Sequence, residues 1–346
     1  MTTAMSFALP PALEASEPPE ARGLTREAVR MLVSSRAEDR LEHSTFSLFP
    51  TFLEEGDLVV VNTSGTLPAA VDGIDPEGRR VVVHFSTELD RRLWVVELRR
   101  TSPRTSLPWG DEEVPRRIEL SGGGSLELLE PYAASRRLFV ARVCTPTAVT
   151  GWLAVHGRPI RYGYVDRPWP ISMYQNVFVT EPGSAEMPSA GRPFTADIVT
   201  RLVAKGIGVS PVVLHTGVAS LEQGERPYPE RVRVPPATAA RVNLAKAAGR
   251  RVVAIGTTVV RALESAFDDR TGKVCALDGW TDLVVSPGRG VAVVDGLLTG
   301  WHEPEASHLL MLEAVAGRPL LEVSYRAALS EAYLWHEFGD VHLVLP

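Results

Sequence analysis

Short apolar runs separated by glycine-containing turns dominate residues 58–150 of this chain. LVVVN, RRVVVHF, RLWVVEL, RRIEL, SLELLE and RLFVARV are each wholly apolar at their centre or alternate apolar with polar positions. Asp72-Gly73, Glu77-Gly78 and the segment from Ser121 to Gly124 lie between several of these runs, as expected of tight turns. Several short strands at this spacing predict a small antiparallel β-barrel or sandwich.

From Thr195 onward the pattern alternates between helix and strand. Thr195 precedes a helix-spaced apolar segment that ends at Gly206, and Val209–Leu214 is a short apolar strand. The other elements predicted here are a helix over 236–248, a hairpin formed by 283–286 and 291–295, and helices over 309–316 and 324–335. Alternation of this kind predicts a partly parallel sheet covered by helices.

The stretch 251–265 organises this second part. Val252–Ile255 is wholly apolar, as in a strand covered on both faces, and Gly256-Thr257-Thr258 then predicts a turn with a threonine capping a helix. Such a turn exposes backbone N–H groups at the carboxyl edge of the sheet, where open α/β sheets bind ligands. A plain helix cap, with Arg261 and Glu264 on the solvent side, explains the local pattern equally well.

These two patterns predict an α/β protein in which an antiparallel β-barrel is inserted into a partly parallel sheet domain. The sheet domain comprises 1–57 and 151–346, and the barrel domain comprises 58–150. Residues 1–20 carry Pro and Glu with little periodicity and are predicted to be a flexible leader. The Pro-rich and aromatic segment 152–174 fits either a substrate cleft or a packed connection between the domains.

The composition, 45% hydrophobic and 23% charged, is that of an ordinary globular protein. A net charge of −6 argues against a general polyanion binder, so nucleic-acid recognition would require a local basic patch. With Cys144 and Cys275 as its two cysteines, the chain fits a cytoplasmic setting without a disulfide framework. No run has the length and apolar character of a membrane span.

Common catalytic motifs are missing from the sequence. It contains no glycine fingerprint for dinucleotides, no phosphate loop and no serine elbow. His302 and His308 are six residues apart with Pro304 between them, which does not fit a zinc helix, so we predict no metal site. His215 directly follows a strand and is either a ligand-orienting or a structural histidine.

Ordered sequence blocks cover most of the chain and are densest from Met187 onward. They are EEGDLVVVN (54–62), MPSAGRPFT (187–195), VVLHTGV (212–218), IGTTVVRALES (255–265), GWTDLVVSPG (279–288), VVDGLLTGWHEP (293–304) and FGD (338–340). In this order they resemble the S-adenosylmethionine:tRNA ribosyltransferase-isomerase family of queuosine synthesis. The resemblance implies an α/β domain interrupted by a β-barrel.

The resemblance also implies an activity. That family transfers the ribosyl unit of S-adenosylmethionine to the aminomethyl group of a 7-deazaguanine base in tRNA, giving epoxyqueuosine. Adenine and methionine leave, so the chemistry needs a base near the carbon next to the sulfonium and an acid for the departing adenine. S-adenosylmethionine is then a co-substrate, tRNA the partner and no metal is required; a cytoplasmic monomer is expected.

The matching blocks suggest site residues. Catalytic groups are expected at His215, Arg261 and Glu264, and a donor cleft is expected between Gly256-Thr257-Thr258, His215 and the 279–288 block. The residues expected to bind substrate are Asn62, Ser189, Gly191, Gly217, Gly256, Thr257, Thr258, Trp280, Asp282, Pro287, Gly288, His302 and Asp340.

Some positions depart from the family pattern. Gly65 and Ala70 stand where the family has Arg, and Pro193 stands where it has His. Two alternatives therefore remain: a transferase or lyase that uses S-adenosylmethionine on a small acceptor other than tRNA, and a non-catalytic nucleoside- or RNA-binding protein. If tRNA is the acceptor, the residues expected to replace the missing contacts are Arg192, Tyr228, Arg231 and Arg233.

Overall fold

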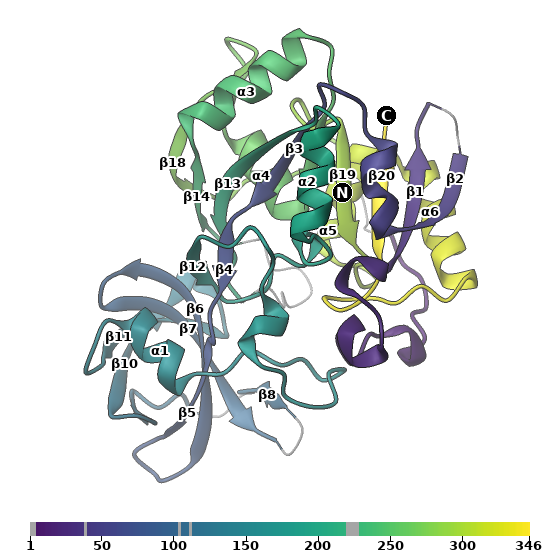
Figure 1. Ribbon diagram of the computed structural model, residues 1–346. Coiled ribbons are helices and arrows are strands. Elements are labelled where there is room, and N and C mark those ends of the chain that lie inside the picture. Colours follow the sequence, from purple (N-terminus) through teal and green to yellow (C-terminus); the bar gives the residue numbers. More distant parts are fainter. Residues whose placement is uncertain (1–4, 38–39, 103–104, 111–112, 219–227) are drawn as a thin grey trace.

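A nine-stranded mixed sheet forms the larger part of the computed structural model, which describes residues 5–37, 40–102, 105–110, 113–218 and 228–346 (Figure 1). In spatial order its strands are β18 (Leu277–Thr281), β14 (Glu230–Val234), β13 (Gly208–His215), β3 (Leu58–Asn62), β15 (Val252–Ile255), β19 (Gly296–Gly300), β20 (Val341–Leu345), β1 (Arg30–Ser35) and β2 (Arg40–Thr45). Strands β13, β3, β15 and β19 run parallel to one another. The predicted partly parallel α/β architecture is confirmed.

Helices cover both faces of this sheet. They are α2 (Ala196–Ala204), α3 (Pro236–Ala247), α4 (Thr257–Ser265), α5 (Ser307–Ala316) and α6 (Arg318–Ser330). Val60 packs in one apolar cluster with residues of α3 to α6, whereas Val59 and Val61 pack in another with Ile198 of α2. Successive side chains of a strand point to opposite faces of the sheet. A strand whose two faces are both covered by helices can therefore be apolar at every position.

Helices α2 and α4 begin in different ways, one with a side-chain cap and the other without. The predicted Thr195 cap is confirmed, since its hydroxyl accepts a hydrogen bond from the backbone N–H of Ile198. The predicted threonine cap of α4 is wrong: Gly256, at φ 93°, occupies the cap position and offers no side chain. The Thr258 hydroxyl instead accepts a hydrogen bond from the Asn62 amide at 3.2 Å.

The inserted domain is a closed six-stranded antiparallel barrel. Its strands are β5 (Ala70–Ile74), β6 (Arg80–Asp90), β7 (Leu93–Thr101), β9 (Arg117–Leu120), β10 (Gly124–Pro131) and β11 (Leu138–Cys144), with β8 (Ser106–Pro108) added beside β7 and α1 (Val149–His156) following β11. Strand β7 pairs with both β6 and β11, which closes the barrel. The predicted β9–β10 hairpin turn is confirmed, with Gly122 and Gly123 at positive φ.

A short parallel pair joins the two domains. It consists of β4 (Ser64–Thr66), where the chain leaves the sheet, and β12 (Glu181–Ser184), where the chain returns. The prediction that Leu58–Asn62 begins the barrel is wrong, because β3 lies at the centre of the large sheet. An apolar run of this length fits a buried strand in either domain, so its composition alone did not decide the assignment.

The remaining short elements complete the described chain. They are β16 (Phe267–Asp268), β17 (Lys273–Val274) and the 3-10 turns at Pro11–Leu13, Pro19–Arg22, Arg26–Ala28, Phe46–Phe52, Tyr132–Ala134, Ile171–Tyr174 and Ser189–Gly191. In the described ranges, no helix has the length and apolar character needed to cross a membrane.

Three further predictions are wrong. Residues 5–20 are no flexible leader: Met5 and Ala15 are buried, and the backbone of 13–15 bonds to Trp335 (residues 1–4 lie outside the described ranges). The predicted hairpin over 283–295 contains no strand. The last helix ends at Ser330 instead of continuing to Trp335.

Replacing Leu263 with Ala should lower the free energy of unfolding by about 2–5 kcal/mol, because its side chain is fully buried between α4 and the sheet. Chemical denaturation measures this change. Leu244→Ala on α3 is the matched control, since Leu244 is 70% exposed. Equal losses in the two variants would contradict the described packing of α4.

Candidate active site

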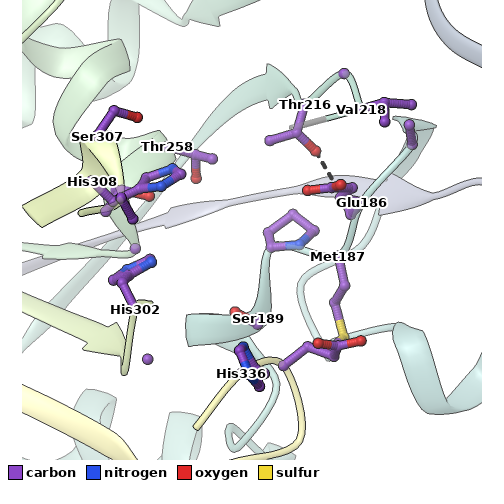
Figure 2. Close-up of a pocket in the computed structure, with 18 of the residues that line it drawn as sticks. Glu186, Met187, Ser189, Thr216, Val218, Thr258, His302, Ser307, His308 and His336 are labelled. Atoms are coloured by element: carbon purple, nitrogen blue, oxygen red, sulfur yellow. Dashed lines mark hydrogen bonds between the residues drawn. The ribbon is translucent and has the colours of Figure 1, made fainter. Parts of the chain in front are cut away.

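A cavity of about 800 Å³ lies between the barrel and the carboxyl edge of the large sheet (Figure 2). Segments that directly follow three parallel strands line it: 216–218 after β13, 256–258 after β15 and 301–308 after β19. Barrel residues, including Ser86 and Thr87, close the opposite side. Parallel sheets bind ligands at this edge because strand ends and helix starts expose polar backbone there.

The start of α4 forms one wall, as predicted. Gly256, Thr257 and Thr258 line the cavity, whereas Asn62 lies behind them. The Asn62 amide donates to the Leu214 carbonyl at 2.9 Å and to the Thr258 hydroxyl at 3.2 Å. Asn62 therefore holds the ends of neighbouring strands together and does not itself line the cavity.

Arg261, also predicted, lines the same wall in a buried ion pair with Glu230. Each of the two side chains is 12% exposed. Burial raises the pKa of Glu230, and the Arg261 guanidinium opposes that rise. Among the described residues, Nη1 bonds to Glu230, Nε is buried without a partner, and Nη2 makes no bond. Our site prediction missed Glu230, although the Tyr228-Pro229-Glu230 segment fits an acidic family position.

Two stacked imidazoles lie across the cavity from Thr216. The rings of His302 and His308 have centroids 4.7 Å apart at an angle of 12°, and His302 Nε2 lies 3.0 Å from the Thr299 hydroxyl. Burial lowers the pKa of both groups, that of His308 to about 4, so both are neutral at pH 7. Among the described residues His308 has no hydrogen-bond partner, so its ring is free to bond a ligand. His302 was predicted and His308 was missed.

Aromatic side chains of the domain connection form another wall. Tyr162, Tyr164 and Tyr174 line the cavity, so the segment 152–174 is both the connection and part of the cleft. The ring of Tyr164 stacks on His336 with centroids 3.9 Å apart, and its hydroxyl donates a hydrogen bond to the Glu337 carboxylate. The sequence analysis missed His336 and Glu337, which adjoin the FGD block without belonging to it.

Other predicted residues lie in or near the cavity with different functions. Ser189 and Gly217 line it, whereas Gly191 packs behind it near Asn176. His215 lies behind the wall, with Nδ1 2.7 Å from the Ser64 hydroxyl. Burial lowers the pKa of His215, and its position at the junction of the two domains fits a structural histidine.

The 279–288 block does not reach the cavity, contrary to our prediction. Trp280 lies on the outermost strand β18, where it pairs with Arg231 and is 43% exposed. The predicted ligands Asp282, Pro287 and Gly288 are likewise absent from the cavity wall among the described residues. Asp340 is a turn residue whose carboxylate accepts hydrogen bonds from the backbone of Arg30 and Leu334.

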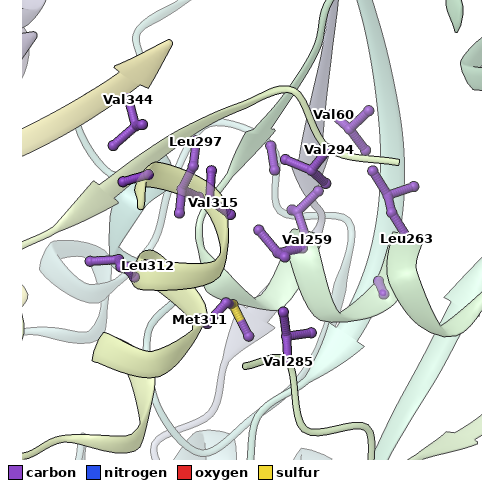
Figure 3. Packing of buried hydrophobic residues seen from close by; sticks show 14 of the residues in the cluster. Val60, Val259, Leu263, Val285, Val294, Leu297, Met311, Leu312, Val315 and Val344 are labelled. Carbon is purple, nitrogen blue, oxygen red and sulfur yellow. The ribbon is translucent and has the colours of Figure 1, made fainter. Parts of the chain in front are cut away.

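Glu264 lies on the face of α4 that is opposite the cavity. This side packs in the core that Figure 3 shows around Leu263 and Val294. The Glu264 carboxylate is 2% exposed and accepts hydrogen bonds from three successive backbone N–H groups, those of residues 292–294, at 2.9–3.3 Å. Arg289 donates another at 3.0 Å. Glu264 thus holds the segment leading into β19, which explains why the predicted hairpin there does not form.

Of the residues predicted to contact RNA, one lines the cavity and three are held in ion pairs. Tyr228 lines the cavity, but Arg192 is buried and paired with Glu20 at 2.8 Å, so it cannot face RNA. Arg231 and Arg233, on β14, form ion pairs with Asp278 and Glu181. Phosphate contacts from this set are therefore few.

The fold and the cavity define a class: an α/β protein with an inserted β-barrel and a ligand cavity at the domain junction. Comparison with known proteins identifies the family. The chain belongs to the queuosine biosynthesis protein family, whose model matches residues 2–344. This result confirms the resemblance drawn from the sequence blocks.

Similar proteins cover nearly the whole chain. The S-adenosylmethionine:tRNA ribosyltransferase-isomerase of Thermus thermophilus is 32% identical, with 99% of each chain covered. The protein of that name from Moorella thermoacetica is 31% identical, with 98% of each covered. The crystal structure of the S-adenosylmethionine tRNA ribosyltransferase from Thermotoga maritima matches with a TM-score of 0.55 and 25% identity, over 99% of each chain.

Glu264→Gln should destabilise the fold, because the amide would place N–H groups against the backbone donors of 292–294. The expected cost is about 1–3 kcal/mol for each buried donor left unsatisfied. Thermal and chemical unfolding measure it. Glu322→Gln, which removes a partly exposed pair with Arg318, should cost no more than about 0.5 kcal/mol. A fully stable Glu264→Gln variant without activity would instead support the catalytic role first expected.

Proposed function

We propose that this protein transfers the ribosyl unit of S-adenosylmethionine to a 7-deazaguanine base in tRNA and isomerises it, giving epoxyqueuosine. One observation carries the proposal: the sequence blocks that resemble the family lie far apart in the chain but line the same cavity. Segments 187–190, 216–218, 255–258 and 299–304 all line it. The similarity to proteins named for this activity, over nearly their whole length, supports the same conclusion.

The cavity suits two cationic reactants. Its volume lies in the upper part of the range for ligand sites, roughly 300–1,000 Å³. Among the described residues, the charged side chains that line it are, apart from histidines, Arg261 and the five glutamates Glu186, Glu230, Glu303, Glu305 and Glu337. A wall of this charge attracts the sulfonium donor and an aminomethyl ammonium, and it repels phosphate. RNA phosphates are therefore placed outside, with the base alone entering.

We place the donor's methionine carboxylate between Arg261 and the start of α4. The free Nη2 of Arg261 and the N–H groups of Thr257 and Thr258 are the cationic or positively polarised groups of this wall. The base is placed against Tyr162, whose ring is itself supported by the nearly parallel ring of Tyr164, 5.7 Å away. Stacking on such rings is the usual way in which proteins hold an unpaired RNA base.

The missing family residues are consistent with this placement. A side chain at Gly65 would meet Val179 at 2.7 Å, so the junction has no room for the arginine of the family pattern. Ala70 is buried in the barrel, and Arg192, next to Pro193, is buried in an ion pair with Glu20 of the N-terminal segment. These positions have become packing positions, and the reaction relies on the polar groups that remain. We expect one chain to suffice, in the cytoplasm, with no metal.

The decisive experiment supplies S-adenosylmethionine with tRNA that carries the deazaguanine base, and separately with the free base. We expect adenine release that depends on the modified tRNA and is accompanied by epoxyqueuosine in the tRNA. Unmodified tRNA is the control. Release with the free base alone would instead favour a small acceptor, and binding without release would favour a non-catalytic protein.

Arg261→Gln should weaken donor binding by at least about tenfold, because a charge-assisted bond to a carboxylate contributes roughly 1.5–3 kcal/mol. Isothermal titration calorimetry with the non-reactive sulfide analogue measures this change. Arg326→Gln, at an exposed position on α6, is the matched control and should bind normally. Unchanged binding in Arg261→Gln would remove Arg261 from the donor site.

A further inference from the structure

One acidic group in the cavity wall, Glu337, is paired with a tyrosine hydroxyl. The Glu337 carboxylate accepts a hydrogen bond from the Tyr164 hydroxyl, and both residues line the cavity. Tyr164 itself cannot swing freely, since its ring lies between Tyr162 and His336 in nearly parallel stacks. The pair is therefore a rigid carboxyl–hydroxyl unit in the wall of the site.

Burial of this unit favours the protonated form of its carboxyl group. Burial raises the pKa of Glu337, and Glu303 adds to the rise, whereas Tyr164 and His336 oppose it. Burial and then the negative charges of Glu337, Glu303 and Glu14 raise the pKa of Tyr164 well above its ordinary value. His336 lies next to two of these acids. Its Nε2 is 3.3 Å from a carboxylate oxygen of Glu14, and its Nδ1 is 3.7 Å from one of Glu303.

Among the described residues of the cavity, the two stacked histidines and Glu230 are poorly suited to give a proton. His302 and His308 have lowered pKa values and are neutral at pH 7. Glu230 faces the Arg261 guanidinium, which favours its ionised form. Glu264 lies outside the cavity with its oxygens occupied by backbone N–H groups. Glu337 differs from these groups, because its buried carboxyl group is held by a neutral hydroxyl instead of a cation.

We propose that Glu337 is the general acid for the departing adenine and that Tyr164 is its positioning residue. This assignment rests on the proposed function, because it concerns the acid that the ribosyl transfer requires. It adds a residue from outside the shared sequence blocks to the site.

The bond between the ribosyl carbon and the adenine nitrogen breaks, and its electron pair stays on adenine. The Glu337 carboxyl proton moves to a ring nitrogen of the purine, so neutral adenine leaves and Glu337 becomes a carboxylate, hydrogen-bonded by Tyr164. The ribose ring oxygen shares a lone pair with the carbon that adenine leaves, and loss of a proton from the carbon next to the sulfonium balances the charge. That proton, carried through solvent, returns Glu337 to its acid form.

Glu337→Gln should therefore lower kcat for adenine release by about 10²–10⁴-fold, with little change in the KM for the donor. The wild-type rate should fall as pH rises through the pKa of Glu337, because the ionised form cannot donate, and the variant should lack this fall. A donor analogue with a more electron-poor purine, which leaves without protonation, should restore much of the lost rate.

Tyr164→Phe provides the test of positioning. Loss of its hydrogen bond to the carboxylate should move the high-pH fall to still higher pH, and a merely structural role would not shift it in this direction. Glu331→Gln, at an exposed position after α6, is the control, and melting temperatures verify that each variant folds.

The outcomes separate the two proposals. If the wild type releases adenine and Glu337→Gln does so with the same rate and pH profile, the acid assignment alone is overturned. A lower rate that the activated donor does not restore would also overturn it. No adenine release from the wild type with any acceptor would overturn the proposed function and, with it, this step.

Discussion

The two domains are held in register by buried hydroxyl groups that have no access to water. Ser64 and Ser184 are both 0% exposed and their hydroxyls lie 2.6 Å apart, directly between β4 and β12. Ser64 also contacts His215 at 2.7 Å, at the end of β13. A buried hydroxyl without a partner is costly, so this network tolerates little displacement. Because the cavity lies between the domains, its width depends on these contacts.

The electrostatics of the cavity follow from the same arrangement. Strand ends and the start of α4 supply polar backbone on one side, while the connection between domains supplies tyrosines on the other. Glutamates outnumber Arg261 along the wall, and the stacked imidazoles are uncharged at neutral pH. Such a surface selects a compact cation and an aromatic base together. It is also in keeping with the net charge of −6.

Much of the fold was predictable because periodicity and turn residues are local signals. Val252–Ile255 and the barrel hairpins carried them clearly, and the sequence blocks located the walls around Gly256 and His302. Long-range contacts were not predictable. Nothing in the sequence near Glu264 shows that its oxygens accept the N–H groups of 292–294, and this contact converts a predicted hairpin into an irregular segment. Likewise, Glu337 acquires its partner Tyr164 from 173 residues away.

Glu264 and Glu337 show how partners, more than residue type, decide the chemistry of a carboxyl group. Glu264 meets several backbone donors and a guanidinium, so its lone pairs are occupied and it serves as a fixed anchor. Glu337 meets one hydroxyl and the negative charge of Glu303, and burial raises its pKa. Both acids lie near the ends of elements that shape the cavity, yet only the second faces it. A carboxyl group in that setting can hold a proton and release it to a ligand, which an anchor with filled lone pairs cannot do.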